Sequence, residues 1–188
     1  MNSTLKAIAE RFSCRDFTDE IPNDKDLSAI AHAAIQAPSG MNRQVWQFIV
    51  VKNKKLIGDM EAEGLNVLSA MEDKSMYDRI MARGGKLFYN APCMIYIAVK
   101  NDVNPRGAAL IDCGIAAQNI AIAASSLGIA SLHCGLASLA FAANKADEFK
   151  SRLKFQEGYE CGMAILLGYA KTPGTPHTPD PEKITVIG

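Results

Sequence analysis

Hydrophobic positions in the first third of the chain recur first with the period of a helix and then with that of a strand. Between Asn23 and Pro38 they follow an i, i+3, i+4, i+7, i+8 spacing, at Leu27, Ile30, Ala31, Ala34 and Ile35. This spacing predicts an amphipathic helix that Asn23 caps and Pro38 ends. Residues 46–51 then have the pattern of a strand, and the β-branched run at 49–51 predicts burial on both of its faces.

The same signals continue along the chain. Helices are predicted near the N-terminus, over much of 54–88, over 107–127 and over about 138–153, and strands over 94–99, 129–134 and 163–167. Four prolines between 171 and 181 predict an extended arm, and the apolar residues after it alternate with Thr185 as in a strand. The pattern predicts an α+β fold, with residues 1–188 as one domain and residues 170–188 as its C-terminal arm.

The composition argues against several classes of function. Twenty basic residues balance twenty acidic ones, so there is no net charge to attract nucleic acid or an anionic membrane. The five cysteines are scattered, odd in number and without a CxxC pair, which argues against a disulfide framework and against a metal site. No basic segment followed by an apolar run opens the chain, so no signal peptide is expected.

One apolar stretch has to be weighed as a membrane span. Residues 108–143 are rich in alanine, but polar side chains interrupt them at Asp112, Gln118, Asn119 and Ser125. A buried helix explains this composition better than a membrane span. We therefore expect a soluble, cytoplasmic protein.

Two short segments carry the candidate chemistry. Arg11, Ser13 and Arg15 alternate along an extended run, so their side chains point the same way, and the planar arginine forks suit a phosphate. Taken alone, they are explained better as surface arginines paired with nearby carboxylates. The second segment, residues 37–46, presents Ser39, Asn42 and Gln44, whose hydroxyl and amide groups suit a ring edge that carries both carbonyls and an N–H.

In this order, the two segments resemble the flavin-binding segments of the nitroreductase family of FMN-dependent oxidoreductases. The likeness extends to Phe88–Pro92, Asp112–Asn119 with Ser126–Gly128, Ser131–Gly135 and Gly168-Tyr169. It implies the nitroreductase-like fold, with a central, mainly antiparallel sheet flanked by helices and with a long central helix. It also implies a homodimer with FMN at the subunit interface.

Roles follow from the resemblance residue by residue. Arg11 would bind the FMN phosphate, Ser13 the phosphate or ribityl chain, and Arg15 the ribityl and N1/C2 side of the ring. Cys134 and Gly135 would line the ring near N5. The partner subunit would contribute Pro38, Ser39, Gly40 and Asn42, with Gln44 as a weaker candidate. No protein residue is expected to be catalytic, although His133 is a weak candidate proton donor and is better explained as a packing or surface residue.

The implied activity is ping-pong oxidoreduction. NAD(P)H would bind transiently and give a hydride to flavin N5, and a nitroaromatic, quinone or similar small-molecule acceptor would then take the electrons. Alternatives are dehalogenation, heterocycle oxidation or flavin consumption on the same fold, or flavin binding without useful turnover. Val45 stands where the family usually has proline. The usual basic phosphate contact of the tail has no clear counterpart among Lys171, His177 and Lys183.

Overall fold

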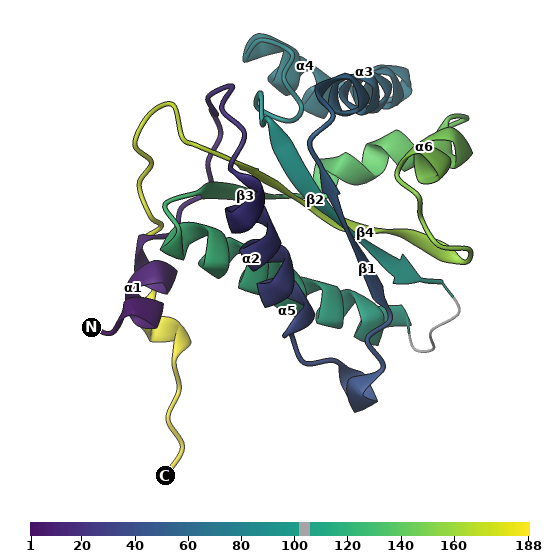
Figure 1. The fold of residues 1–188 in the computed structure, drawn as a ribbon. Coiled ribbons are helices and arrows are strands. Elements are labelled where there is room, and N and C mark those ends of the chain that lie inside the picture. The colour runs from purple at the N-terminus through teal and green to yellow at the C-terminus, as the bar shows by residue number, and fades with distance from the viewer. Residues whose placement is uncertain (102–105) are drawn as a thin grey trace.

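A four-stranded antiparallel sheet forms the centre of the computed structural model, which describes residues 1–101 and 106–188 (Figure 1). Its strands stand in the order β1-β2-β4-β3, with bounds β1 Trp46–Val51, β2 Cys93–Lys100, β3 Ala130–Cys134 and β4 Tyr159–Gly168. All three pairings are antiparallel. The predicted α+β fold with a central antiparallel sheet is therefore confirmed, while its description as one domain stays a prediction.

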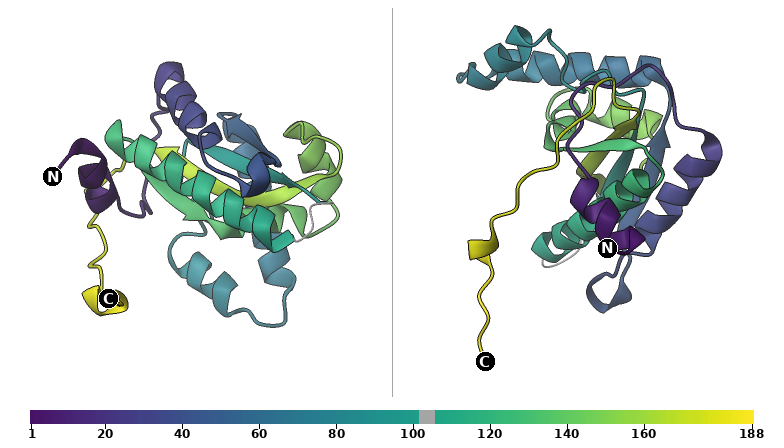
Figure 2. Two further views of the ribbon diagram at one scale, coloured as in Figure 1. Left: turned by 90° about the horizontal axis from the view of Figure 1, so that it is seen from below. Right: turned by 90° about the vertical axis from the view of Figure 1, so that its left-hand side faces the viewer.

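Two helices cover one face of the sheet (Figure 2): α2 (Asp24–Ile35) and α5 (Arg106–Ser126). Alternate residues of β2, such as Ile95 and Ile97, point into this layer and are fully buried. Buried alanines of α5, including Ala116 and Ala117, allow the helix to lie close to the strands because they have almost no side chain.

The opposite face is covered by the segment between β1 and β2 together with the one between β3 and β4. These comprise α3 (Lys54–Ala70), α4 (Ser75–Ala82), the 3-10 segment η2 (Gly135–Phe141) and α6 (Ala146–Arg152). Met94 and Tyr96 of β2 are buried in this layer. Because central strand β2 has helices on both faces, its core residues are apolar without interruption, which is the pattern of a strand buried on both sides.

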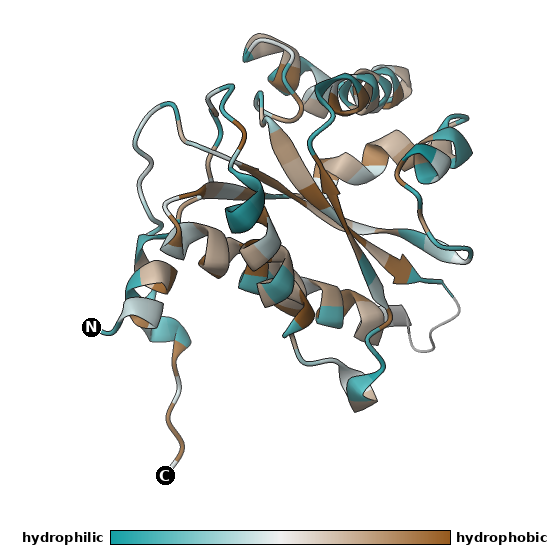
Figure 3. Cartoon of the chain, viewed as in Figure 1, coloured by the Kyte–Doolittle hydropathy of each residue, from teal (hydrophilic) through white to brown (hydrophobic). Residues whose placement is uncertain are grey.

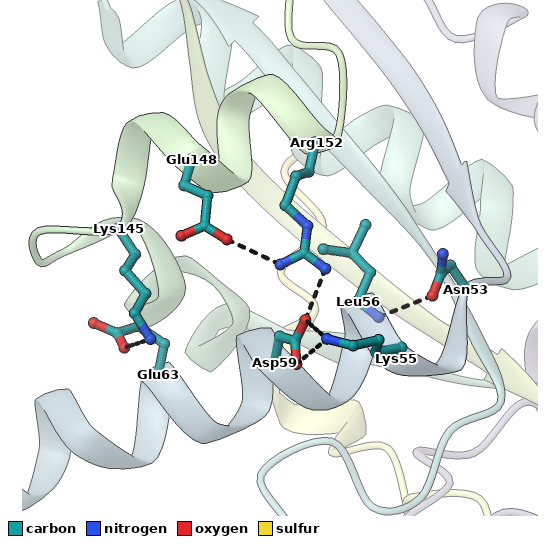
Figure 4. Close-up of polar contacts among 8 residues, drawn as sticks. All are labelled: Asn53, Lys55, Leu56, Asp59, Glu63, Lys145, Glu148 and Arg152. Atoms are coloured by element: carbon teal, nitrogen blue, oxygen red, sulfur yellow. Dashed lines mark hydrogen bonds and ion pairs between the residues drawn. The ribbon is translucent and has the colours of Figure 1, made fainter.

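Ion pairs link α3 to the segment around α6 (Figure 4). The Arg152 guanidinium contacts Asp59 at 2.7 Å and Glu148 at 3.1 Å, and Lys145 contacts the buried Glu63 at 3.2 Å. Hydrogen bonds from Arg152 and then from Lys55 hold the pKa of Asp59 below its usual value. These contacts join α3 to α6 at the surface, while buried residues of α3 such as Ile57 and Met60 pack in the core.

Two expectations for the body of the molecule differ from the structure, and the strand pattern at residues 184–187 forms no strand of the described sheet. Val50 is 38% exposed rather than buried, because β1 is an edge strand and the helices do not cover its whole outer face. The helix predicted over about 138–153 is divided into η2 and α6. The other predicted elements are confirmed to within a few residues, including the N-terminal helix α1 (Ser3–Glu10).

Helix α5 is long and apolar enough, by length and composition alone, to cross a membrane. It lies against β2, β3 and β4, and its residues Ala116, Ala117 and Ile120 are fully buried in the core beneath it. The same test is passed by core helices of soluble proteins, and the position of α5 on the sheet agrees with the buried helix that the sequence predicts.

The C-terminal arm leaves the sheet beside the N-terminal segment. Lys171 donates its backbone N–H to the Asp16 carbonyl at 3.0 Å, and Gly174 lies directly against the ring of Phe12. The arm then makes the short turn η3 (Pro181–Lys183) and extends away from the body of the molecule (Figure 1). Its last apolar residues belong to no strand of the described sheet and are exposed.

Two glycines of α3 give a stability test. A Cβ at Gly64 would lie 2.6 Å from Cδ2 of the fully buried Leu87, whereas a Cβ at Gly58 would meet nothing within 4 Å. We expect Gly58→Ala to raise the free energy of unfolding by about 0.5–1 kcal/mol through helix propensity. Gly64→Ala should lower it by about 1–2 kcal/mol through overpacking. Urea denaturation of both variants measures these free energies. Equal stabilisation by the two would contradict the close approach of Gly64 to Leu87.

Candidate functional site

The segment with the two arginines runs beside β3. Ser13 forms an isolated parallel bridge with Ser131, and the Cys14 N–H donates to the Ser131 carbonyl at 3.0 Å. Cys14 is buried in the core, whereas Arg11 and Ser13 are half-buried and Arg15 is exposed, with its Nη1 donating to the Ser13 carbonyl at 3.4 Å. Pairing with the edge strand thus holds the segment extended, as its alternating polar residues predict.

A pocket of about 410 Å³ lies where this segment, α1, the end of α5 and the start of the arm meet. Arg11 and Ser131 both line it, and each has a buried polar atom without a hydrogen-bond partner among the described residues: Nη1 of Arg11 and Oγ of Ser131. Ser131 is only 2% exposed. Burying an unpaired polar group costs about 1–3 kcal/mol, so two such groups in one pocket indicate donors arranged for a ligand with acceptor oxygens.

Further along β3, the side chain of His133 is partly buried. Its pKa is lowered, first by burial and then by the positive charge of Arg11, while a hydrogen bond with the Ala117 backbone acts in the opposite direction. The neutral imidazole is therefore favoured near neutral pH. This position agrees with the packing role that the sequence favours for His133.

Cys134 and Gly135 stand at the end of β3, where η2 begins. Burial raises the pKa of the Cys134 thiol to about 11, so the thiol is protonated at neutral pH and is a poor nucleophile. Gly135 is exposed, and its carbonyl accepts a hydrogen bond from the Ser138 hydroxyl at 2.8 Å. Any contact that this pair makes with a ligand would come chiefly from the backbone, as the resemblance implies.

The second candidate segment forms a tight, exposed loop. Pro38 precedes it, and Gly40–Asn42 makes one 3-10 turn, η1. The Ser39 hydroxyl accepts from the Gln44 N–H at 3.0 Å, and the Gln44 side-chain amide donates to Asn42 Oδ1 at 3.1 Å. Hydrogen bonds within the loop thus join Ser39, Asn42 and Gln44 to one another.

The two segments do not meet within one protomer. The Ser125 hydroxyl near the end of α5 donates to the Ala7 carbonyl of α1, beside the pocket, whereas Asp112 near the start of α5 contacts Gly40 of the loop. Ser125 lies thirteen positions after Asp112, which is about 20 Å along an α-helix. Figure 1 shows the two segments beyond opposite ends of α5. The candidate site is therefore divided between distant parts of one chain.

Two residues beside these segments were not among the predicted site residues. Ser131 belongs to a stretch that shows the resemblance, but only the fold reveals its hydroxyl as buried and unpaired. Asp112 is also buried, and its contact with Gly40 spans 72 positions of sequence, which no local pattern indicates. Of the three basic candidates in the arm, Lys171 and His177 are exposed, and Lys183 pairs with Asp180 at 3.8 Å far out on the arm.

An α+β fold with a pocket of buried, unpaired donors defines the chain as a candidate binder of an anionic small molecule. The Nitroreductase family model matches residues 8–169, and this chain therefore belongs to the nitroreductase family. Over the full length of both chains it is similar to a solved nitroreductase with bound FMN from Desulfitobacterium hafniense DCB-2. The identity between the two is 59% and the TM-score 0.96.

Matches to two curated relatives are local. A protein of Archaeoglobus fulgidus named "Putative NADH dehydrogenase/NAD(P)H nitroreductase" is 40% identical over 60 residues, which are 32% of this chain and 34% of the relative. Iodotyrosine deiodinase of Thermotoga neapolitana is 32% identical over 74 residues, 39% of this chain and 37% of the relative. The matched segments thus span about a third of the length of each relative.

The environment of His133 predicts a pH effect. Because its pKa lies below the usual 6.5 in the folded protein, the unfolded chain binds this proton more readily, so stability decreases as the pH falls below about 6.5. We expect His133→Gln to reduce the loss of thermal stability between pH 7 and pH 5. Melting temperatures across this range test it. An unchanged slope would show that His133 keeps an ordinary pKa.

Proposed function

We propose that this protein is a homodimeric FMN-dependent oxidoreductase that uses NAD(P)H to reduce a small-molecule acceptor. The observation that carries the proposal is the pair of buried, unpaired donors, Arg11 Nη1 and Ser131 Oγ, in one pocket. A guanidinium and a hydroxyl suit a phosphate group, because both donate and the guanidinium supplies positive charge. The bound FMN of the D. hafniense nitroreductase supports the choice of ligand.

The residues present fit FMN along its length. Arg11 and Ser131 would hold the phosphate, and Ser13 would contact the phosphate or the ribityl chain. Exposed Arg15, whose Nη1 donates to the Ser13 carbonyl, would turn toward the ribityl and N1/C2 side of the ring, where its charge would stabilise the negative charge of the reduced form. The backbone of Cys134 and Gly135 would line the ring. Lys171 and His177 are exposed and do not line the pocket of Arg11 and Ser131, so neither is assigned as a further phosphate ligand.

A second copy of the chain would complete the site. The loop lies about 20 Å from the pocket along α5. Its candidate residues would therefore reach a flavin only in the partner subunit: Pro38, Ser39, Gly40, Asn42 and Gln44. Exposed apolar side chains support such an interface. They lie on α1, α5 and the end of the arm, whose last residues are mostly brown in Figure 3: Leu5, Ile8, Leu110, Ile111, Ile115, Ile184, Val186 and Ile187.

The chemistry that FMN supplies when bound is two-electron transfer between NAD(P)H and an acceptor such as a nitroaromatic compound or a quinone. The protein would supply position and charge. The two substrates would use the same space in turn, which gives ping-pong kinetics. His133, whose neutral form is favoured by burial, is not needed as an acid, since water can supply the proton.

Reductive dehalogenation is the second candidate. The match to iodotyrosine deiodinase favours it, although that match covers only 37% of the relative. Iodide release from iodotyrosine by the reduced protein, with no faster reduction of quinones or nitro compounds, would support this reading over the first.

The first experiment is the visible spectrum of the purified protein with FMN, recorded without oxygen before and after NADH or NADPH. We expect a shifted flavin band that bleaches with the nucleotide and returns with a quinone or nitro compound. A bound band that neither nucleotide bleaches would instead indicate a flavin-sequestering protein. Failure to bind FMN would refute the proposal.

Substitutions in the pocket separate ligand binding from folding. Arg11→Ala should weaken FMN binding by about 10–100-fold, and Ser131→Ala by about tenfold, because each removes a donor to a charged group. Ser131→Ala should leave the FMN-free protein as stable as before or more so, since it removes an unpaired buried hydroxyl. Fluorescence titration and thermal melts measure both effects. Ser69→Ala removes a hydroxyl that donates to the Asn66 carbonyl on α3, outside the pocket. It is the control and should change neither FMN affinity nor stability.

A further inference from the structure

Asp112 is a buried carboxylate with an unusual set of neighbours. It is 8% exposed, and both of its carboxylate oxygens lie 3.2 Å from the backbone N–H of Gly40. Among the described residues, no basic side chain forms an ion pair with it. A carboxylate can accept about four hydrogen bonds, and in the described structure the Gly40 N–H is the one donor to the Asp112 carboxylate.

The loop that it contacts is strained. Met41, Asn42 and Gln44 all have φ near +50°, the left-handed conformation that L residues other than glycine rarely adopt. Such backbone persists only where the surrounding contacts determine it. Within the loop, the Ser39 hydroxyl accepts a hydrogen bond from the Gln44 N–H. The one side chain outside the loop that hydrogen-bonds to its backbone in the described structure is Asp112.

We propose that Asp112 is a positioning residue: from α5 it fixes the Pro38–Gln44 loop in the shape in which the loop contacts the flavin of the partner subunit. The inference rests on the proposed function, because it assumes that FMN binds at the dimer interface. Asp112 itself touches no ligand in this arrangement. It acts through the backbone N–H of Gly40, which lies 3.2 Å from both carboxylate oxygens.

The same helix provides a control for general packing. Asn119 lies seven residues, or about two turns, after Asp112 on the same face of α5. Its amide donates to the Ala33 carbonyl of α2 at 3.1 Å, so it joins α5 to α2 without contacting the loop. If polar residues on this face had a purely structural role, Asn119→Ala and Asp112→Ala would have the same effect on FMN affinity.

The first test compares three homodimeric variants by FMN titration and thermal melts. Asp112→Ala should weaken FMN binding by about tenfold, the effect of one lost hydrogen bond to a charged group. Asp112→Asn keeps a carbonyl acceptor for Gly40 and should stay within about threefold of the wild type. Asn119→Ala should bind FMN as the wild type does, whatever its melting temperature. Equal FMN affinity in Asp112→Ala and the wild type would overturn the proposal.

The decisive test uses mixed dimers of Arg11→Ala and Asp112→Ala chains, isolated with two different tags. If each loop serves the partner's flavin, one site carries both defects and the other carries neither, so the mixed dimer binds one FMN with wild-type affinity. If each loop serves its own chain, both sites carry one defect and neither binds normally, which would overturn the proposal. Absence of FMN binding by the wild type would instead refute the proposed function itself.

Discussion

The close packing of α5 on the sheet is the constraint on which the rest of this structure depends. Its buried alanines let the helix backbone approach β2, β3 and β4, and the core on this face is built around that contact. Side chains of ordinary size there would lift the helix and leave cavities or force rearrangement, at a cost of a few kcal/mol. The position of α5 in turn determines where both candidate segments lie.

Each end of α5 supports a different part of the proposed site. Near its C-terminal end, Ser125 contacts α1 and lines the pocket that holds the unpaired groups of Arg11 and Ser131. Near its N-terminal end, Asp112 contacts the loop at Gly40. A rigid helix thus keeps the two parts apart in one chain, which is why the proposed site takes its loop from a second copy of the chain.

Much of the fold was predictable because the signals were local. The helical spacing between Asn23 and Pro38 and the buried run of β2 each match one element of the structure. The exposure of Val50 was not predictable from its β-branched neighbours, because the place of a strand within a sheet depends on partners distant in sequence. The division of the predicted helix at 138–153 likewise depends on how the chain leaves β3.

The sequence by itself determined the family and the chemical character of the two candidate segments, because residue type and short spacing are properties of the chain alone. Only the tertiary structure decided which groups lie together. It brought Ser131 beside Arg11 and left both with unpaired buried atoms, and it set Asp112 against Gly40 across 72 positions. Burial and hydrogen-bond satisfaction are properties of packed elements, so they exist only once the strands and helices have come together.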